Sequence, residues 1–347
     1  FFRTSPQRAE ALCPSHRAAI RAAPESDMLY TMLLWPHANA RYQVETEKLA
    51  RAELEVTLAR LGVEYTWEEG GVAGLPSLNF AARPLADAEM AVLSRHSLLY
   101  ALFERREDGA LLPLLGREAP RVGADLPGII KYKGKTNETF TQWLVNRAGL
   151  AGAMPEKASL LDPMCGRGTT LFVALNRGWD ATGSDIDRAA LREAEQFFKR
   201  YLEYHRFKHA TRRGSLTLRG KKSAPYTDFA LAEGALRLAE VDATRGREAF
   251  GAAKFDLLCA DLPYGVQHGA NMPLETLLRL ALPAWAETLK HGAAMALSFN
   301  AQKLPARKVR ALLAGAGLRV LEGGPYDHFE HWVEQAVTRD IAVAVRP

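Results

Sequence analysis

Apolar residues recur in two different patterns along the chain, and the first pattern covers its N-terminal third. Leu29–Trp35 is an apolar run typical of a buried strand, and Tyr42–Leu61 has apolar residues at helical spacing. Ser77–Ala82 predicts another strand, and Ala86–Glu104 predicts a short helix leading into a third strand. Strands and helices in this order predict a small α+β unit over residues 28–110.

From about Ile129 onward, short apolar runs alternate regularly with longer segments of helical period. Strands are expected at Ser159–Asp162, Asp180–Asp185, Leu236–Val241, Phe255–Asp261 and Ala293–Asn300. Helices are expected at Glu138–Ala148, Thr169–Arg177, from Asp187 to about His205, Leu274–Lys290 and Pro305–Ala314. This alternation predicts a parallel sheet covered on both faces. Leu318–Leu321 and Glu334–Val345, which only a loop separates, suit an antiparallel pair at the end of the sheet.

Three segments break these patterns. Residues 1–27 are rich in Arg, Ala and Pro, lack the apolar stretch of a secretory signal, and are interpreted as a peripheral extension. The Gly- and Pro-containing stretch 106–127 is the candidate linker. Residues 199–222 hold nine Lys and Arg against one acid, Glu203, which fits either a solvated loop or a contact with nucleic-acid phosphates.

The composition narrows the class of protein. The chain has 347 residues, 48% hydrophobic and 24% charged, which is typical of two soluble globular domains and excludes a disordered or fibrous protein. No apolar run is long enough to cross a membrane, and three scattered cysteines favour a reduced, cytoplasmic location. The histidines form no metal-binding pattern, and although His205 and His209 have helical spacing, no third ligand accompanies them. The net charge of +5 is compatible with a polyanionic partner.

The first candidate motif follows the expected strand 159–162. It reads Asp-Pro-Met-Cys-Gly-Arg-Gly-Thr-Thr over residues 162–170, and its two glycines allow a ligand to approach the backbone at the start of a helix. Asp185, about 20 residues further on at the end of the next strand, is placed to bind ribose hydroxyls. Alternatively, Asp185 or Asp187 caps the following helix. A third small residue is missing from the glycine motif, which argues against NAD.

The second candidate motif ends the expected strand 255–261 with Asp-Leu-Pro-Tyr-Gly. It resembles the Asp-Pro-Pro-Tyr type of motif of S-adenosylmethionine-dependent amino-methyltransferases. An exocyclic base amine is a poor nucleophile, and an Asp and a nearby backbone carbonyl can accept its two hydrogens and direct its lone pair. Pro263 makes the backbone rigid, and Tyr264 offers a flat face to a base taken out of its stack. The alternative is an ordinary turn.

Several motifs in the same order extend the resemblance to a family. Gly134–Ala148, the two motifs above, Gly-Ser-Asp-Ile-Asp at 183–187 and Val-Asp-Ala-Thr at 241–244 resemble the THUMP-associated tRNA guanine-N2 branch of class I methyltransferases. The resemblance implies an α/β class I methyltransferase domain over 126–347, with a Rossmann-like seven-stranded sheet whose last strand is antiparallel. It implies a smaller ferredoxin-like or reduced THUMP-like α+β domain over 28–125 that binds substrate. The implied reaction is methyl transfer to guanine N2 in tRNA.

The resemblance also implies roles for individual residues. The residues expected to hold S-adenosyl-L-methionine are Thr136, Asp162, Met164, Gly166, Gly168, Thr169, Asp185, Ile186, Asp242, Ala243 and Asp261. Those expected to orient the target amine are Asp261, Leu262, Pro263 and Tyr264. Leu262 departs from the usual proline, and Arg167 from the usual small residue between the glycines; Arg167 is expected either to reach a substrate phosphate or to lie on the surface. Lys131, Lys133 and Lys135 around Tyr132 suit a nucleic-acid backbone, although surface lysines are often only solvated.

Other functions share parts of this pattern. The same chemistry could act on DNA, at adenine N6 or cytosine N4. A protein glutamine is another candidate substrate, although its enzymes usually carry Asn in place of Asp261. A module that binds RNA or cofactor without activity is the third alternative. No metal and no membrane partner are expected, and an accessory protein is not excluded.

Overall fold

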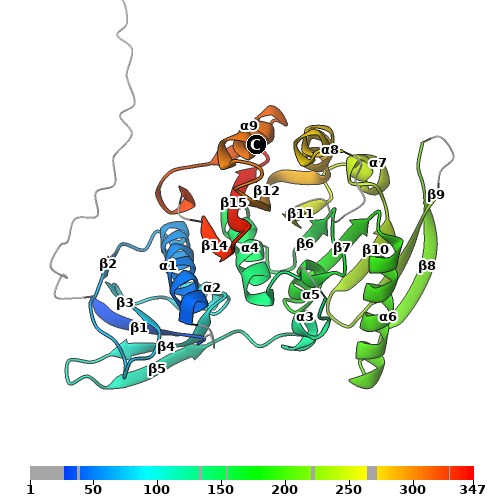
Figure 1. Ribbon diagram of the computed structural model, residues 1–347. Helices are drawn as coiled ribbons and strands as arrows, with labels where there is room; N and C mark the ends of the chain where they lie inside the picture. The colour runs from blue at the N-terminus through cyan, green and yellow to red at the C-terminus, as the bar shows by residue number, and fades with distance from the viewer. Residues whose placement is uncertain are drawn as a thin grey trace, which may run out of the picture.

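The computed structural model describes residues 27–36, 40–132, 135–153, 155–219, 223–263, 272–327 and 329–347. These residues form two β-sheets, each with helices packed against it (Figure 1). None of the helices described is long and apolar enough to span a bilayer.

The N-terminal sheet has the strand order β2-β3-β1-β4-β5, and all its neighbouring strands are antiparallel. Its elements are β1 Met28–Leu34, α1 Ala40–Leu61, β2 Tyr65–Trp67, β3 Ser77–Ala82, α2 Asp87–Leu93, β4 Leu99–Arg105 and β5 Leu111–Gly116. The predicted strand, helix, strand, helix, strand sequence is present. The strand β5 lies within the stretch predicted as a linker, which is a correction. Pro113 is tolerated there because β5 is an edge strand with a single neighbour.

The C-terminal sheet has a parallel core in the order β10-β7-β6-β11-β12. β15 is antiparallel to β12 and lies between β12 and β13, so the predicted antiparallel pair at the end of the sheet is confirmed. The seven strands of this arrangement are β6 Ser159–Asp162, β7 Asp180–Asp185, β10 Ala235–Glu240, β11 Phe255–Asp261, β12 Leu289–Asn300, β13 Arg319–Leu321 and β15 Val337–Val345. A further strand, β14 His331–Glu334, pairs with β15.

Helices cover both faces of this sheet, as the alternation predicts. The helices are α3 Leu126–Ile129, α4 Glu138–Ala151, α5 Thr169–Leu175, α6 Arg188–Tyr204, α7 Gly246–Phe250, α8 Leu274–Thr288 and α9 Ala306–Gly315. Adjacent residues of one strand point to opposite faces: Leu257 joins the core under α4, α5 and α6, whereas Leu258 joins the core under α8 and α9. The C-terminal part is therefore a three-layer α/β/α domain.

The basic segment 199–222 is not the loop that one interpretation expected. α6 ends at Tyr204, and the chain then forms β8 Ala210–Thr217, which pairs with β9 Ser223–Ala230. β9 in turn extends the sheet beside β10. His205 and His209 therefore do not share a helix, because α6 ends before them. The sequence pattern concealed β8 because an edge strand with solvent on its side chains needs no apolar alternation.

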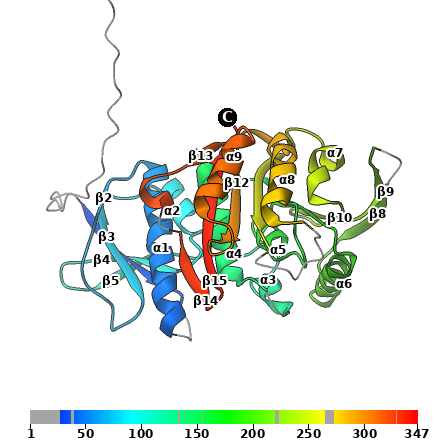
Figure 2. The same cartoon turned by 45° about the horizontal axis from the view of Figure 1, so that its top comes forward.

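Helix α1 is buried on two sides and joins the two sheets. Leu54 and Leu58 pack in the core of the N-terminal sheet, whereas Ala52 and Val56 pack in the core that contains α4 and α5. Figures 1 and 2 both show α1 between the N-terminal sheet and β14. The two parts of the molecule therefore share one helix.

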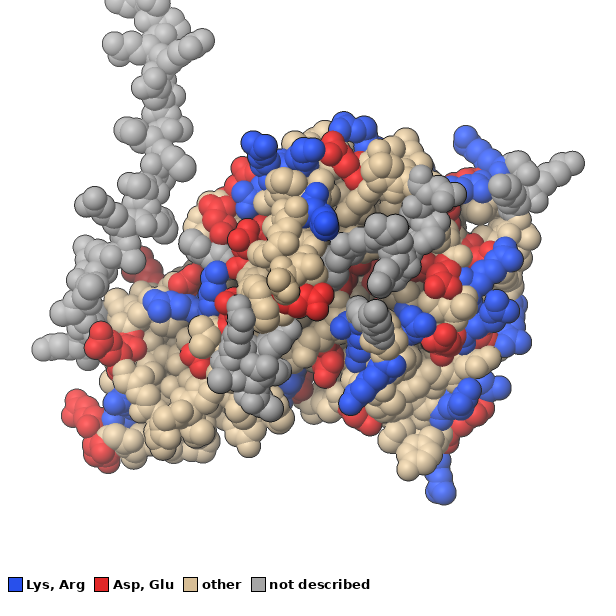
Figure 3. Space-filling model, viewed as in Figure 1, with Lys and Arg blue, Asp and Glu red and all other residues tan. Residues whose placement is uncertain are grey.

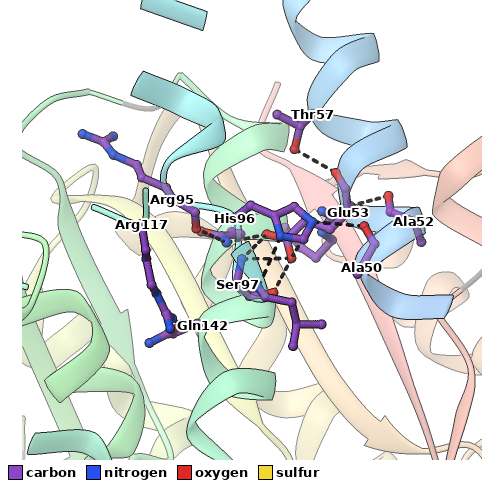
Figure 4. Close-up of polar contacts among 12 residues, drawn as sticks. Ala50, Ala52, Glu53, Thr57, Arg95, His96, Ser97, Arg117 and Gln142 are labelled. Atoms are coloured by element: carbon purple, nitrogen blue, oxygen red, sulfur yellow. Dashed lines mark hydrogen bonds and ion pairs between the residues drawn. The ribbon is translucent and has the colours of Figure 1, made fainter. Parts of the chain in front are cut away.

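A buried carboxylate on α1 strengthens this junction (Figure 4). Glu53 is 1% exposed and accepts hydrogen bonds from the backbone and hydroxyl of Ser97 and from the side chain of Asn146 on α4. His96 Nε2 lies 3.8 Å from the same carboxylate, and burial lowers the pKa of this histidine. Glu53 thus connects α1, the loop before β4 and α4 at one point.

Candidate active site at the carboxyl ends of the parallel strands

The predicted motif residues gather where the parallel strands end. Asp162 ends β6 and is 2% exposed. One of its oxygens accepts the Met164 N–H at 3.1 Å, and its side chain also bonds Thr170. Burial, together with the nearby carboxylates of Asp185 and Asp261, raises the pKa of Asp162 to about 7. Asp162 therefore lies within electrostatic reach of two further carboxylates at this edge of the sheet.

The glycine turn after β6 has the conformation that the sequence predicts. Gly166 and Gly168 have φ of +51° and +86°, in the left-handed region that favours glycine. The N–H of Cys165 donates to the Ser184 carbonyl at 3.0 Å and ties the turn to β7. A Cβ at Gly166 would meet nothing within 4 Å, so the surface of the turn is open at that point.

Asp187, not Asp185, takes the capping role that the sequence left open between them. Asp187 caps α6 by accepting the N–H groups of Ala189 and Ala190. Asp185 instead accepts the N–H of Gly166 at 2.8 Å and that of Asp187 at 2.9 Å. Its carboxylate is therefore held against the glycine turn, beside Ile186, whose side chain is 54% exposed.

The end of β10 is built around a short 3-10 helix. Asp242 caps this helix, η1 Ala243–Arg245, by accepting the Thr244 N–H at 2.8 Å. The indole of Trp285 donates to the carbonyl of Ala243 at 2.8 Å. These bonds fix the backbone of the segment that the resemblance assigns to adenine.

The end of β11 carries Asp261, whose carboxylate accepts a hydrogen bond from the Thr136 hydroxyl. Leu262 is 1% exposed, and its N–H donates to the Ser298 carbonyl at 2.9 Å. A proline at 262 lacks that N–H, so this leucine keeps a bond between β11 and β12 that the usual motif residue cannot form. Tyr264 lies outside the described residues.

The segment before α4 closes one side of the site. Tyr132 hydrogen-bonds Thr169, and its ring centroid lies 4.4 Å from the guanidinium carbon of Arg167. Burial raises the pKa of Tyr132, and the charges of Asp261 and Asp162 act in the same direction. Arg167 is also paired with Glu193 on α6. Tyr132 and Glu193 thus belong to the site, and only the aromatic ring among lysines signalled Tyr132 in the sequence.

The predicted basic cluster is divided by its contacts. Lys135 donates to the Pro127 carbonyl at 2.8 Å and lies 3.6 Å from Glu138, which leaves its side chain 11% exposed. Lys131 is exposed, and Lys133 lies outside the described residues. Lys131 is therefore the accessible cation among the described residues of this cluster.

The described residues include no group of three or more His, Cys, Asp or Glu side chains that could hold a metal ion. The strand order gives a mixed α/β sheet with a parallel core, accompanied by a separate N-terminal antiparallel sheet, and the motif residues lie at the carboxyl edge, where open α/β sheets bind their ligands.

Some solved structures resemble this chain at low sequence identity. No protein-family model matches the sequence, and no curated protein matches it significantly. TrmN from Thermus thermophilus is 16% identical, with a TM-score of 0.45, over 92% of this chain and 100% of that chain. A TehB-like SAM-dependent methyltransferase from Corynebacterium glutamicum is 17% identical, with a TM-score of 0.36, over 59% of this chain and 85% of that chain. Magnesium protoporphyrin IX methyltransferase from Synechocystis PCC 6803, with bound SAM, is 17% identical, with a TM-score of 0.39, over 66% of this chain and 93% of that chain.

Proposed function

We propose that this protein transfers a methyl group from S-adenosylmethionine to an exocyclic amine of a nucleic-acid base, guanine N2 in tRNA. The observation that carries the proposal is the position of Asp261. It ends β11 at the carboxyl edge of the sheet, is followed by Leu-Pro, and lies among the other carboxylates of this edge.

The described residues fit S-adenosylmethionine in charge and shape. Three neighbouring carboxylates favour a ligand that carries positive charge, and this cofactor has an ammonium and a sulfonium group. Asp162 would hold the ammonium group, and Asp185 the ribose hydroxyls. The open turn at Gly166 leaves room for the amino-acid part, and the exposed Ile186 offers an apolar face to adenine.

Asp261 would act on the amine rather than on the cofactor. When bound, S-adenosylmethionine supplies an activated methyl group. The Asp261 carboxylate would accept one amine hydrogen, and a backbone carbonyl, for which Leu262 is the candidate, would accept the other. The hydrogen bond from Thr136 holds the carboxylate in one orientation. Asp261 would stabilise positive charge on the amine, and the proton can leave to water.

A nucleic-acid substrate is supported by the surface around the site. Lys131 is exposed beside Tyr132, and further cations are exposed on α6 and β8. The family resemblance favours tRNA over DNA, and it assigns Tyr264 to the face of the target base.

The test is methyl transfer from labelled S-adenosylmethionine to total tRNA, ribosomal RNA and genomic DNA in parallel, followed by mass spectrometry of nucleosides. N2-methylguanosine in tRNA is the expected product. Product only in DNA would show that DNA, not tRNA, is the substrate. Cofactor binding without transfer to any of these substrates would contradict the proposed activity.

Two variants separate chemistry from folding. Asp261→Asn should lower the rate about 100-fold or more while cofactor binding persists. Asp180→Asn is the matched control, because Asp180 lies exposed at the opposite, amino end of β7. An Asp261→Asn variant with the wild-type rate would refute the assigned role.

A further inference from the structure

A groove runs along the exposed side of α6, outside the site described above. Its volume is about 670 Å³, and α3 and the residue before it form the opposite wall. The aromatic side chains along it include Phe197, Tyr201 and Tyr204. We infer that this groove binds an unpaired nucleotide of the same RNA whose base the proposed function methylates; the inference rests on that function.

One end of the groove carries an aromatic ring that is open to solvent. Tyr204 is 82% exposed, and its ring centroid lies 5.0 Å from that of His205 at an interplanar angle of 82°. The His205 ring lies 4.3 Å from that of Tyr201, which is 6% exposed. Unpaired bases stack on exposed rings such as that of Tyr204.

The groove carries one arginine that has no acidic partner among the described residues. Of the two acids in the groove, Glu193 pairs with Arg167, whereas Asp125 has a neutral partner, the Tyr201 hydroxyl, at 2.7 Å. Arg200 bonds only the neutral amide of Gln196 among the described residues. Its guanidinium can therefore meet a phosphate.

Further cations lie just beyond the end of α6. Arg206 and Lys208 are exposed and have no acidic partner in the described part of the chain. Figure 3 shows basic side chains gathered on this part of the surface, over α6 and the β8–β9 hairpin. A strand leaving the groove would meet these charges.

A chain of side-chain contacts links the groove to the candidate active site. Glu193 lines the groove and holds Arg167, and Arg167 in turn covers the ring of Tyr132 beside Asp261. A nucleotide in the groove and a base at Asp261 can therefore belong to one RNA.

Binding of labelled total tRNA to the full chain, followed by fluorescence anisotropy, tests the inference. The double variant Tyr204→Ala/Arg200→Ala should raise Kd about 10-fold, whereas Tyr204→Phe, which keeps the ring, should stay close to wild type. An RNA duplex without unpaired bases should bind wild type and double variant equally. The double variant Leu280→Ala/Arg307→Ala removes an exposed apolar side chain and an exposed arginine from α8 and α9, and is the matched control.

The outcomes separate the groove from the proposed function. A raised KM for tRNA with unchanged kcat in the groove variant supports the inference. If the groove variant methylates tRNA with unaltered KM and Kd, the inferred nucleotide-binding role of the groove is wrong, whereas the proposed methyltransferase function is retained. If wild type methylates no RNA but the groove variant loses tRNA binding, the result supports RNA binding by the groove and contradicts the proposed methyl transfer to RNA. If the α8/α9 control variant loses as much tRNA affinity as the groove variant, the inferred role of the groove is wrong.

Discussion

The hydroxyl of Thr136 donates a hydrogen bond to the carboxylate of Asp261, although the two residues are 125 positions apart. The bond joins the segment before α4 to the end of β11. It lets the residues that close the site control the orientation of the group proposed to meet the amine.

Thr136→Val should lower kcat about 10-fold, because a hydrogen bond to a charged group contributes about 1.5–3 kcal/mol and the valine removes this one orienting bond from Asp261. Thr136→Ser keeps the hydroxyl and should stay near the wild-type rate. The measurement is steady-state methyl transfer at saturating S-adenosylmethionine and tRNA. Equal rates for the Val and Ser variants would contradict a positioning role.

Cofactor affinity should depend on pH through Asp162. Its pKa of about 7 in the free protein is above the ordinary value, so the carboxylate is mostly protonated at pH 6. Only the ionised form pairs with an ammonium group, and binding therefore releases a proton and strengthens as pH rises. Between about pH 6 and 7.5, Kd for S-adenosylmethionine should fall about 5- to 10-fold, as calorimetry can measure.

Two controls isolate this effect. Asp162→Asn should bind the cofactor more weakly and with no such pH dependence. Methylthioadenosine lacks the amino-acid part, so its Kd should stay flat over the same range. A pH dependence that persists for methylthioadenosine would assign the titration to another group.

Removing the carboxylate of Glu53 should destabilise the whole molecule. Glu53→Ala leaves Ser97 and Asn146 without their buried acceptor and should reduce the free energy of unfolding by about 3 kcal/mol. Urea unfolding measures the loss. Glu55→Ala, on the same helix but in a partly exposed pair with Arg51, should cost less than about 0.5 kcal/mol. If the two variants lose comparable free energy of unfolding, the buried hydrogen bonds of Glu53 do not contribute more to stability than the exposed pair of Glu55.

Gly183 should tolerate no side chain. A Cβ there would lie 2.3 Å from a methyl carbon of Leu171 and 2.7 Å from the sulfur of Cys165. Gly183→Ala should therefore destabilise the protein by about 1–3 kcal/mol in urea unfolding. Gly315→Ala is the control: nothing lies within 4 Å of its added Cβ at the end of α9, so it should be neutral or slightly stabilising. A Gly183→Ala variant as stable as wild type would show that α5 can shift away from β7.

The sequence by itself determined the parallel core and the places where its chemistry lies. The bounds expected for the strands 159–162, 180–185 and 255–261 are those observed. The first and third are short apolar runs that end at polar motifs, as buried strands do, and the second, Asp-Ala-Thr-Gly-Ser-Asp, is recognised by its place in the alternation of strands and helices. Carboxyl ends of neighbouring parallel strands meet at one edge, so the motifs could be placed together from their order alone.

Only the tertiary structure decided the rest. β8 is a solvent-exposed strand that carries no apolar period in the sequence, and β5 is an apolar edge strand whose Pro113 and flanking Gly and Pro residues suggested a linker. The double burial of α1, the stacking of Arg167 on Tyr132, and the bond between Thr136 and Asp261 each join residues far apart in the chain. Such contacts depend on how the completed helices and strands pack against one another. The local pattern of apolar and polar residues does not indicate which of their surfaces will come into contact.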